Sequence, residues 1–347
     1  MIVFWALVPL GILYLPKLWE YDLGKNSITV FSWGDILDPG VIKEFEKETG
    51  IKVHLSYYSS NEELIVKLKA TRGKGYDLIV PSDYAVQILR KEKLLKPLDS
   101  SQLTFLSQLN PLLLHHFYDP GLEYSVPFAW EIFGLGIDST YFQEKTYPSS
   151  WGLIFDLPTI DYRIGMLNDP IEAVSLAAFY LYGTPHFLSE EEKKHVRKLL
   201  VAQHRFVAVY ASFRADYLLA TKNCPVVAAS SSYIFRTMRK FPFIRFIVPQ
   251  EGTFISIENL CIPAVSRKSA LVYRFMNYLY EKKSIASHFA AYQFLPATTD
   301  AYEFLQLPDE MKALLSPKET LLPYHFIREI LPEEEICDLW TDVKSFR

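Results

Sequence analysis

The sequence predicts an α/β fold with a mainly parallel β-sheet, and three observations support it. Residues 27–81 alternate apolar runs with amphipathic segments that begin at capping residues and end at glycine. The middle of the chain continues the mixed pattern, and a hydrophobic content of 50% is enough for a sizeable packed core. The length of 347 residues suggests two domains at roughly 150 residues each.

The first predicted elements follow from local signals. Residues 27–33, SITVFSW, are typical of a short buried strand. Asp38 and Pro39 then provide an N-cap and a first helical residue for a helix over 39–50. Residues 51–55 alternate apolar and polar side chains as the next strand.

A second helix and a third strand complete this part. Ser60 and Glu63 form a capping-box pattern for a helix over 61–73. Residues 76–81, YDLIVP, are nearly continuously apolar, as strands buried in parallel sheets are. The resulting β-α-β-α-β order predicts parallel neighbouring strands.

The remaining chain is also mixed, and no linker separates its two halves. Ser189 and Glu192 cap a helix over 190–204. The sequence further predicts strands over 124–138, 225–230, 243–249 and 251–263, helices over 269–283 and 284–292, and a helical C-terminal stretch over 309–343. The absence of a linker suggests that the chain crosses between the two domains more than once.

The N-terminal segment contains an uninterrupted apolar run over residues 2–15. Such a run is short for a bilayer span, which needs about 20 residues, but it suits the apolar region of a secretory signal. Neither a basic segment before it nor a small-residue cleavage site after it is present, and a buried helix is the alternative. We expect residues 1–25 to be an export signal or signal-anchor.

Composition and missing motifs exclude several functions. A net charge of −4 argues against a nucleic-acid binder. Cys224, Cys261 and Cys337 lack the spacing of a disulfide scaffold or a zinc site, although one disulfide of unassigned pairing is possible in an exported protein. No phosphate-binding loop, nucleophile elbow or zinc-protease motif is present. We therefore expect no catalytic residue, no cofactor and no metal site.

Aromatic and polar side chains follow two of the predicted strands. Trp33 and Asp35 follow the first strand, and Ser82 and Tyr84 follow the third. Ligands of open α/β sheets bind beyond the carboxyl ends of the strands, so a ring and a charge at these positions suit a cationic ligand. The alternatives are a core tryptophan, a turn-capping aspartate and a serine that caps the next helix.

Two carboxylates begin a later helix. Asp169 and Glu172 are three residues apart and so share one helix face. They could bind a cation together. The alternative is an ordinary pair of acidic residues favoured by the positive end of the helix dipole.

Five blocks of sequence together resemble one family. They are FEKETGIKVHLSYYSSNEEL, GYDLIVPSDYAV, YSVPFAWEIFGLGID, PSSWGLIFD with Trp151, and PQEGTFISIENLCIPA. In this order they resemble the spermidine/putrescine-binding periplasmic proteins of polyamine ABC transporters. The resemblance covers about residues 27 to 347 and is weakest after residue 300.

The resemblance implies a type II periplasmic-binding-protein fold, with two lobes of mixed, mainly parallel sheets joined by a crossover hinge. Lobe 1 would comprise residues 26–132 plus 257–300, and lobe 2 residues 133–256 plus 301–347. It also implies a periplasmic, monomeric solute-binding subunit, unless the N-terminal segment stays uncleaved and holds it at the membrane. Its partners would be a polyamine and an inner-membrane ABC permease, with no nucleic acid.

The resemblance also places ligand-binding residues. They fall on Trp33, Asp35, Ser82, Tyr84, Asp169, Glu172, Glu258 and Phe294. Two tryptophans of the family's aromatic box fall on Ser230 and Ser256, so the charges are kept while part of the aromatic lining is lost. A different solute, such as another amine, an amino-acid derivative or a metal complex, therefore remains the alternative.

Overall fold

The computed structural model describes residues 24, 26–142, 147–211, 215–305, 307, 311–312 and 324–346, which divide into two compact units. Unit 1 takes the described residues of Met1–Leu109, His115–Val126 and Asn259–His288, and unit 2 takes those of Asn110–Leu114, Pro127–Glu258 and Phe289–Arg347. The lobe boundaries drawn from the resemblance stay a prediction.

The predicted export signal or signal-anchor cannot be compared with the structure. The apolar run over 2–15 lies outside the described residues. Within the described ranges, no helix has the length and hydropathy needed to cross a bilayer.

The sheet of unit 1 is mainly parallel. Its strands are β1 (Ser27–Trp33), β2 (Lys52–Tyr58), β3 (Leu78–Ile79) and the end of β9 (Thr253–Cys261), in the order β2-β1-β3-β9. β1 pairs in parallel with both β2 and β3, and Ile79 pairs with Cys261 in the antiparallel sense. The parallel pairing predicted from the β-α-β-α-β order is therefore confirmed, although β3 is shorter than predicted.

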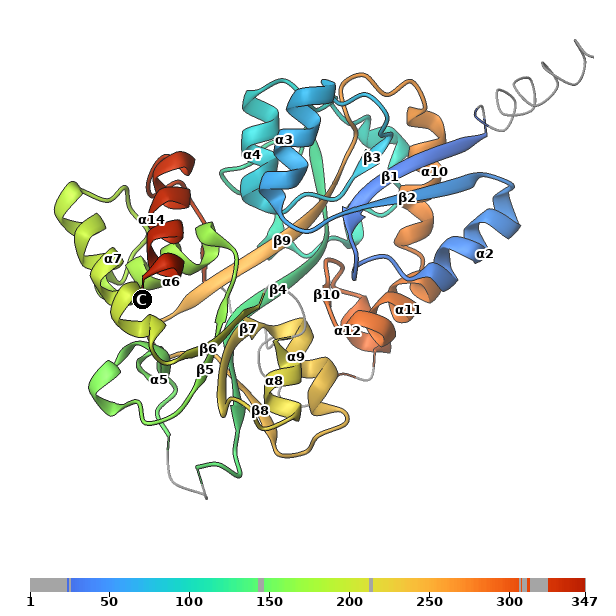
Figure 1. Cartoon of the computed structure of the whole chain (residues 1–347). Coiled ribbons are helices and arrows are strands. Elements are labelled where there is room, and N and C mark those ends of the chain that lie inside the picture. Colours follow the sequence, from blue (N-terminus) through green and yellow to red (C-terminus); the bar gives the residue numbers. More distant parts are fainter. Residues whose placement is uncertain are drawn as a thin grey trace, which may run out of the picture. The chain divides into compact units, whose positions relative to one another are not determined.

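Helices connect and cover these strands. They are α2 (Pro39–Thr49), α3 (Asn61–Thr71), α4 (Asp83–Lys91), α10 (Ser269–Leu279) and α11 (Lys282–Tyr292), with short 3-10 turns at Ser100–Gln102 and Leu106–Gln108. α3 and α4 lie side by side (Figure 1). Their partly buried faces explain the amphipathic pattern of the sequence.

The predicted helix ends of unit 1 are largely confirmed. The Asp38 carboxylate accepts a hydrogen bond from the Gly40 N–H, and Gly50 ends α2 with a φ of 71°, a conformation that glycine adopts at little cost. The Ser60 hydroxyl accepts from the Glu63 N–H at 3.2 Å. The Glu63 carboxylate accepts from the N–H of Ser59 rather than from that of Ser60, so the reciprocal half of the capping box is not formed.

The start of α2 is tied to α11 by a buried histidine. The Asp38 N–H donates to Nδ1 of His288 at 3.1 Å, and the Ser287 hydroxyl donates to the Asp38 carboxylate at 2.5 Å. Burial lowers the pKa of His288 from 6.5 to about 4, and the nearby Asp38 charge opposes this effect only partly. The folded protein therefore holds the neutral imidazole.

This histidine should make the stability of the protein depend on pH. Because its pKa is lower in the folded chain than in the unfolded chain, stability is complete above pH 6.5 and is lost as the pH falls towards 4. Between pH 7 and pH 5 we expect a loss of about 2 kcal/mol. His288→Asn, which keeps an acceptor but does not titrate, should remove that loss in urea denaturation curves. His54→Asn, at an exposed position of the same unit, is the control, and an unchanged pH dependence in His288→Asn would contradict the prediction.

The sheet of unit 2 is mixed. Its strands are β4 (Ser125–Asp138), β5 (Ile164–Leu167), β6 (Val207–Ala211), β7 (Val226–Ser230), β8 (Ile244–Ile247), β10 (Leu295–Pro296), β11 (Tyr324–Phe326) and most of β9. β5 lies between β6 and β7 and is parallel to both, while β4 pairs in the antiparallel sense with β7, β8 and β10. β11 pairs in parallel with β9, so the helical prediction is wrong for residues 324–326.

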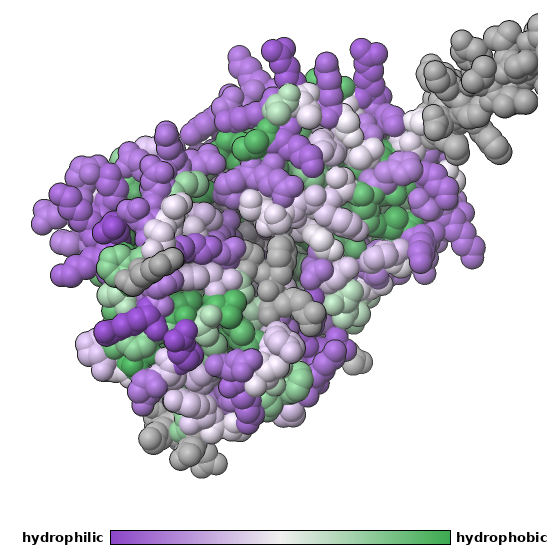
Figure 2. Space-filling view, viewed as in Figure 1, coloured by the Kyte–Doolittle hydropathy of each residue, from purple (hydrophilic) through white to green (hydrophobic). Residues whose placement is uncertain are grey.

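The helices of unit 2 include the one that the sequence predicts best. They are α5 (Gly152–Phe155), α6 (Pro170–Tyr182), α7 (Glu190–His204), α8 (Asp216–Ala220), α9 (Ser231–Met238), α12 (Ala301–Phe304) and α14 (Glu333–Ser345), with 3-10 turns at Pro111–Leu113 and Leu157–Thr159. α7 has the predicted bounds and a complete capping box between Ser189 and Glu192. Figure 2 shows hydrophilic residues over α7, and Figure 1 shows α14 beside α6 and α7.

All three cysteines carry free thiols. Cys224 and Cys261 are buried, and Cys337 is exposed. Burial raises the pKa of the Cys261 thiol well above its usual value. Because the thiolate is the reactive form, this side chain behaves as an inert core residue.

Candidate functional site

In unit 1, an aromatic ring and a carboxylate follow β1 as predicted. Trp33, the last residue of β1, is half-buried, and its ring centroid lies 4.6 Å from that of Tyr58 on β2. Asp35 follows after one glycine and is also half-buried. Both side chains therefore keep some access to solvent.

Ser82 and Tyr84 follow β3. Ser82 stands at the N-cap position of α4 but makes no side-chain capping bond, so the capping alternative is wrong. Its hydroxyl accepts a hydrogen bond from the Asn61 amide at 3.0 Å, and the Tyr84 hydroxyl donates to the Glu62 carboxylate at 3.2 Å. β3 lies beside β1 and is parallel to it, so the four predicted residues of unit 1 gather at the carboxyl edge of its sheet.

A buried carboxylate that was not predicted from the sequence lies between Ser82 and Tyr84. Asp83 is 1% exposed, and its carboxylate accepts from the Tyr84 N–H at 2.7 Å. Burial, assisted by the Asp83 charge, raises the pKa of Tyr118 well above its usual value. Asp83 thus adds negative potential to this edge, and its place in a predicted helix start concealed it.

In unit 2, Asp169 and Glu172 begin α6 beyond the carboxyl end of β5. Asp169 is the N-cap, and its carboxylate accepts from the Glu172 N–H at 3.0 Å. Both residues are half-buried. Asp169 therefore caps α6, and Glu172 lies in the first turn of the same helix, where a negative charge is favoured by the helix dipole. Their role in binding a cation stays a prediction.

Glu258 and Phe294 belong to unit 2 as well. Glu258 is 4% exposed on β9, and its Oε1 accepts from the Ser256 hydroxyl at 3.0 Å. Phe294 is half-buried and directly precedes β10, which pairs with β4 at Trp130. Ser256, where the resemblance has a tryptophan, therefore positions the Glu258 carboxylate instead of providing a ring.

Ser230 is the second serine at a position where the resemblance has a tryptophan, and it is the last residue of β7. Its hydroxyl lies 3.2 Å from that of Ser232, which donates to the Glu131 carboxylate on β4 at 2.7 Å. Burial raises the pKa of Glu131, while hydrogen bonds from Ser232 and Ser230 and the Arg236 charge act in the opposite direction. Glu131 was not predicted from the sequence, although a charge inside an apolar strand is a signal that could have found it.

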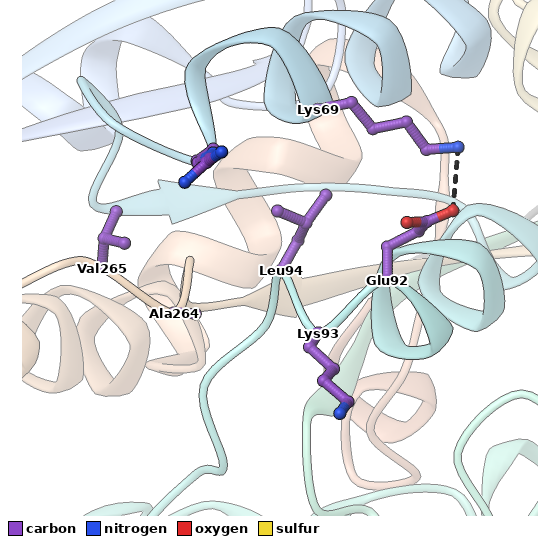
Figure 3. A pocket seen from close by; sticks show the side chains of 7 residues that line it. Lys69, Glu92, Lys93, Leu94, Ala264 and Val265 are labelled. Atoms are coloured by element: carbon purple, nitrogen blue, oxygen red, sulfur yellow. Dashed lines mark ion pairs between the residues drawn. The ribbon is translucent and has the colours of Figure 1, made fainter.

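The structure places a separate cavity of about 450 Å³ in unit 1 (Figure 3). It is lined by Lys69, Arg72, Glu92, Lys93, Leu94, Ala264 and Val265. Lys69 reaches across to Glu92 at 3.0 Å, whereas Lys93 points away from that pair. α3 and α4 both end here, so these cations complement the negative ends of two helix dipoles. None of the predicted ligand-binding residues lines this cavity.

The described residues were also compared with the arrangement that a metal site needs. Among them, no group of three or more histidine, cysteine, aspartate or glutamate side chains is arranged to hold a metal ion. The expectation that the protein has no metal site stays a prediction.

Curated relatives share most of the length of the chain. The spermidine/putrescine-binding periplasmic protein of Salmonella typhimurium is 29% identical over 280 residues, which cover 79% of this chain and 78% of the relative. The putrescine/cadaverine-binding protein of Pseudomonas aeruginosa is 28% identical over 270 residues, which cover 75% of this chain and 76% of the relative.

Solved structures share the fold. A putative spermidine/putrescine ABC transporter protein from Listeria monocytogenes superimposes with a TM-score of 0.82 at 24% identity, covering 93% of this chain and all of that one. Iron-bound HitA from Pseudomonas aeruginosa superimposes with a TM-score of 0.69 at 15% identity, covering 91% of this chain and 99% of that one. These likenesses confirm the predicted α/β fold of type II periplasmic binding proteins.

A family model describes the chain at the level of sequence. The model for bacterial extracellular solute-binding proteins matches residues 40–315, which include all but two of the predicted ligand-binding residues. The match spans both units. The chain therefore belongs to the family of bacterial extracellular solute-binding proteins.

Proposed function

We propose that this protein is the periplasmic solute-binding subunit of an ABC importer, and that its solute is a polyamine such as putrescine or spermidine. The observation that carries the proposal is the set of acidic side chains at Asp169, Glu172 and Glu258 in unit 2. Ammonium groups bind most strongly to carboxylates through charge-assisted hydrogen bonds. The relatives that carry spermidine, putrescine or cadaverine in their names support the same solute class.

Each predicted residue has a role in this proposal. Asp169, Glu172 and Glu258 receive the ammonium groups, and Asp35 adds a further charge. Trp33, Tyr84 and Phe294 contact the methylene chain, since aromatic faces attract both hydrocarbon and cations. Ser82 adds a hydrogen-bonding hydroxyl.

The proposal extends to partners and location. We infer that the protein delivers its solute to an ABC permease of the inner membrane and acts as a monomer. It catalyses no reaction and binds no nucleic acid. An export signal within residues 1–25 takes it to the periplasm.

One observation favours a second solute class. Burial raises the pKa of Glu131, and the Arg236 charge opposes that effect, so a cationic group and a carboxyl group act on each other in unit 2. Such a pair suits a zwitterion, for example an amino-acid derivative. Ser230 and Ser256, where the resemblance has tryptophans, also make the lining more polar.

Ligand-dependent thermal unfolding tests the proposal. The full chain would be heated with putrescine, cadaverine, spermidine or spermine, with γ-aminobutyrate as the zwitterion and sulfate as an anion control. A ligand at 100 times its Kd stabilises the folded state by about 2.7 kcal/mol. We expect at least one polyamine to raise the unfolding temperature at a concentration at which sulfate does not.

Each other outcome has a definite meaning. A shift with γ-aminobutyrate but with no polyamine at millimolar concentration would replace the polyamine by the zwitterion. No shift with any of them would refute both solute classes. Chemical conversion of an amine by the pure protein would contradict the binding-only role.

A further inference from the structure

The C-terminal helix α14 contacts the turn that leads into the first carboxylate of α6. In Figure 1, α14 lies beside α6, whose N-cap is Asp169. Trp340 and Lys344 are four residues apart on α14, so they share one face of that helix. Both side chains bind Asn168, the residue directly before Asp169. The Trp340 indole N–H donates to the Asn168 carbonyl at 3.2 Å, and the Lys344 ammonium donates to the side-chain Oδ1 of Asn168 at 2.5 Å.

The hydrogen bond from Trp340 acts on the backbone of Asp169. The Asn168 carbonyl and the Asp169 N–H belong to one planar peptide unit. A donor that holds the carbonyl therefore also fixes the plane from which the Asp169 side chain projects. Asp169 has extended backbone angles, with a φ of −67° and a ψ of 127°, and its carboxylate accepts from the Glu172 N–H at 3.0 Å. This carboxylate is thus held from two sides, by α6 and by α14.

The side chain of Trp340 is itself held in place. It is 4% exposed, and its ring meets that of Tyr210 edge to face at a centroid distance of 5.1 Å. Tyr210 lies on β6, where it pairs with Met166 of β5, the strand that leads into Asn168. The Lys344 ammonium lies 5.5 Å from the Trp340 ring centroid and 5.4 Å from that of Tyr210, at distances that favour cation–π contacts. α14 therefore contacts both the turn and the strand beside β5.

We propose that Trp340 and Lys344 are positioning residues, which act through Asn168 to hold the Asp169 carboxylate where it receives an ammonium group of the solute. The inference rests on the proposed polyamine function. Charge-assisted hydrogen bonds are short and directional, so a carboxylate that is displaced loses part of their strength. A carboxylate that is fixed before the solute arrives also lowers the ordering cost of binding.

Calorimetric titration of the full chain with putrescine and with spermidine tests the role of Trp340. Trp340→Phe keeps an aromatic ring but loses the N–H donor. Trp151→Phe is the matched control, because the Trp151 indole N–H also donates to a backbone carbonyl of unit 2, that of Gly252. We expect Trp340→Phe to weaken the binding of whichever amine the natural protein binds at least fivefold. Trp151→Phe should bind that amine as the natural protein does.

Combination with Asp169→Asn shows whether Trp340 acts through Asp169. In the Asp169→Asn background, Trp340→Phe should weaken binding less than twofold, because the charge that Trp340 positions is already gone. A residue that only stabilises the fold would show no such coupling. Equal weakening in both backgrounds, or none in either, would refute the positioning role of Trp340 while leaving polyamine binding intact.

Lys344→Met tests the second contact, and it decides the matter even if Trp340→Phe does not fold. Methionine keeps an apolar side chain beside the rings but cannot donate to Asn168. Loss of a positive charge near a cationic solute would by itself strengthen binding, whereas loss of the positioning contact weakens it. We expect at least threefold weakening. Lys198→Met, at an exposed position of α7, is the control for the change of charge.

The outcomes separate this inference from the function on which it rests. Unchanged or tighter binding in Lys344→Met would refute the role of Lys344 while leaving polyamine binding intact. Binding of neither amine by the natural protein would refute the proposed function, and this inference with it. A thermal unfolding curve for each variant shows that a loss of affinity is measured on folded protein.

Discussion

Asp169→Asn is expected to weaken polyamine binding at least tenfold and to leave the stability of the protein almost unchanged. The expected loss follows because hydrogen bonds to charged groups are worth about 1.5–3 kcal/mol, and about 1.4 kcal/mol is a factor of ten in Kd. Stability is kept because asparagine caps a helix about as well as aspartate. Its side-chain oxygen can still accept from the Glu172 N–H, as Asp169 does at 3.0 Å.

A second substitution separates charge from structure at this position. Asp169→Ala removes both the charge and the cap, so it should weaken binding similarly and also destabilise the fold by about 0.5–2 kcal/mol. Calorimetric titration gives the affinities, and urea denaturation gives the free energies of unfolding. Asp161→Asn, at an exposed position of the same unit, is the control. Normal polyamine affinity in Asp169→Asn would show that Asp169 is only a helix cap.

Trp151→Ala is expected to destabilise the fold more strongly than Asp169→Ala does. Trp151 is fully buried, and its indole N–H donates to the Gly252 carbonyl at 2.9 Å. Truncating a buried tryptophan to alanine costs about 3–5 kcal/mol, because a cavity is left and apolar burial is lost. The substitution also leaves the Gly252 carbonyl without this donor. The free energy of unfolding from urea denaturation measures the effect.

The matched variant is Trp151→Phe, which keeps an aromatic ring but loses the hydrogen bond. It should cost less than Trp151→Ala, so the difference between the two reports the packing contribution. Trp151 is not among the predicted ligand-binding residues, so the folded fraction of either variant should bind polyamines normally. A loss below about 1 kcal/mol in Trp151→Ala would mean that the surrounding core collapses onto the vacated space.

Elements that depend on local signals could be predicted from the sequence. The capping box at Ser189 and Glu192 gave α7 its predicted bounds, and Asp38, Pro39 and Gly50 marked the ends of α2 and its cap. These signals act within one helical turn, so neighbouring residues suffice to identify them.

Elements that depend on distant partners could not be predicted in this way. β5 has only four residues, and its strand character comes from pairing with β6 and β7 on both sides. β11 is a strand because it pairs with β9. Its own three residues are too few to show the alternating pattern that identifies a strand in a sequence.

The residues of the candidate site also differ in whether local sequence or distant partners reveal them. The carboxyl ends of β1 and β3 could be recognised from their apolar runs, so Trp33 and Ser82 were selected. Glu131 was missed because its neighbours in β4 are apolar, and the residue that donates a hydrogen bond to it, Ser232, is about a hundred residues away in the sequence. The charge of a residue is visible in a sequence, but its neighbours across a sheet are not.

The pairing of Ile79 with Cys261 has a consequence for how the chain matures. The two residues are separated by more than half of the chain, so the sheet of unit 1 lacks its β9 edge until most of the polypeptide has been synthesised. Closing so long a loop is entropically costly, and such non-local contacts slow folding. During that delay the open edge of β3 is a surface on which other chains can aggregate. A protein of this topology is thus suited to export as an unfolded chain, because it reaches its folded state late.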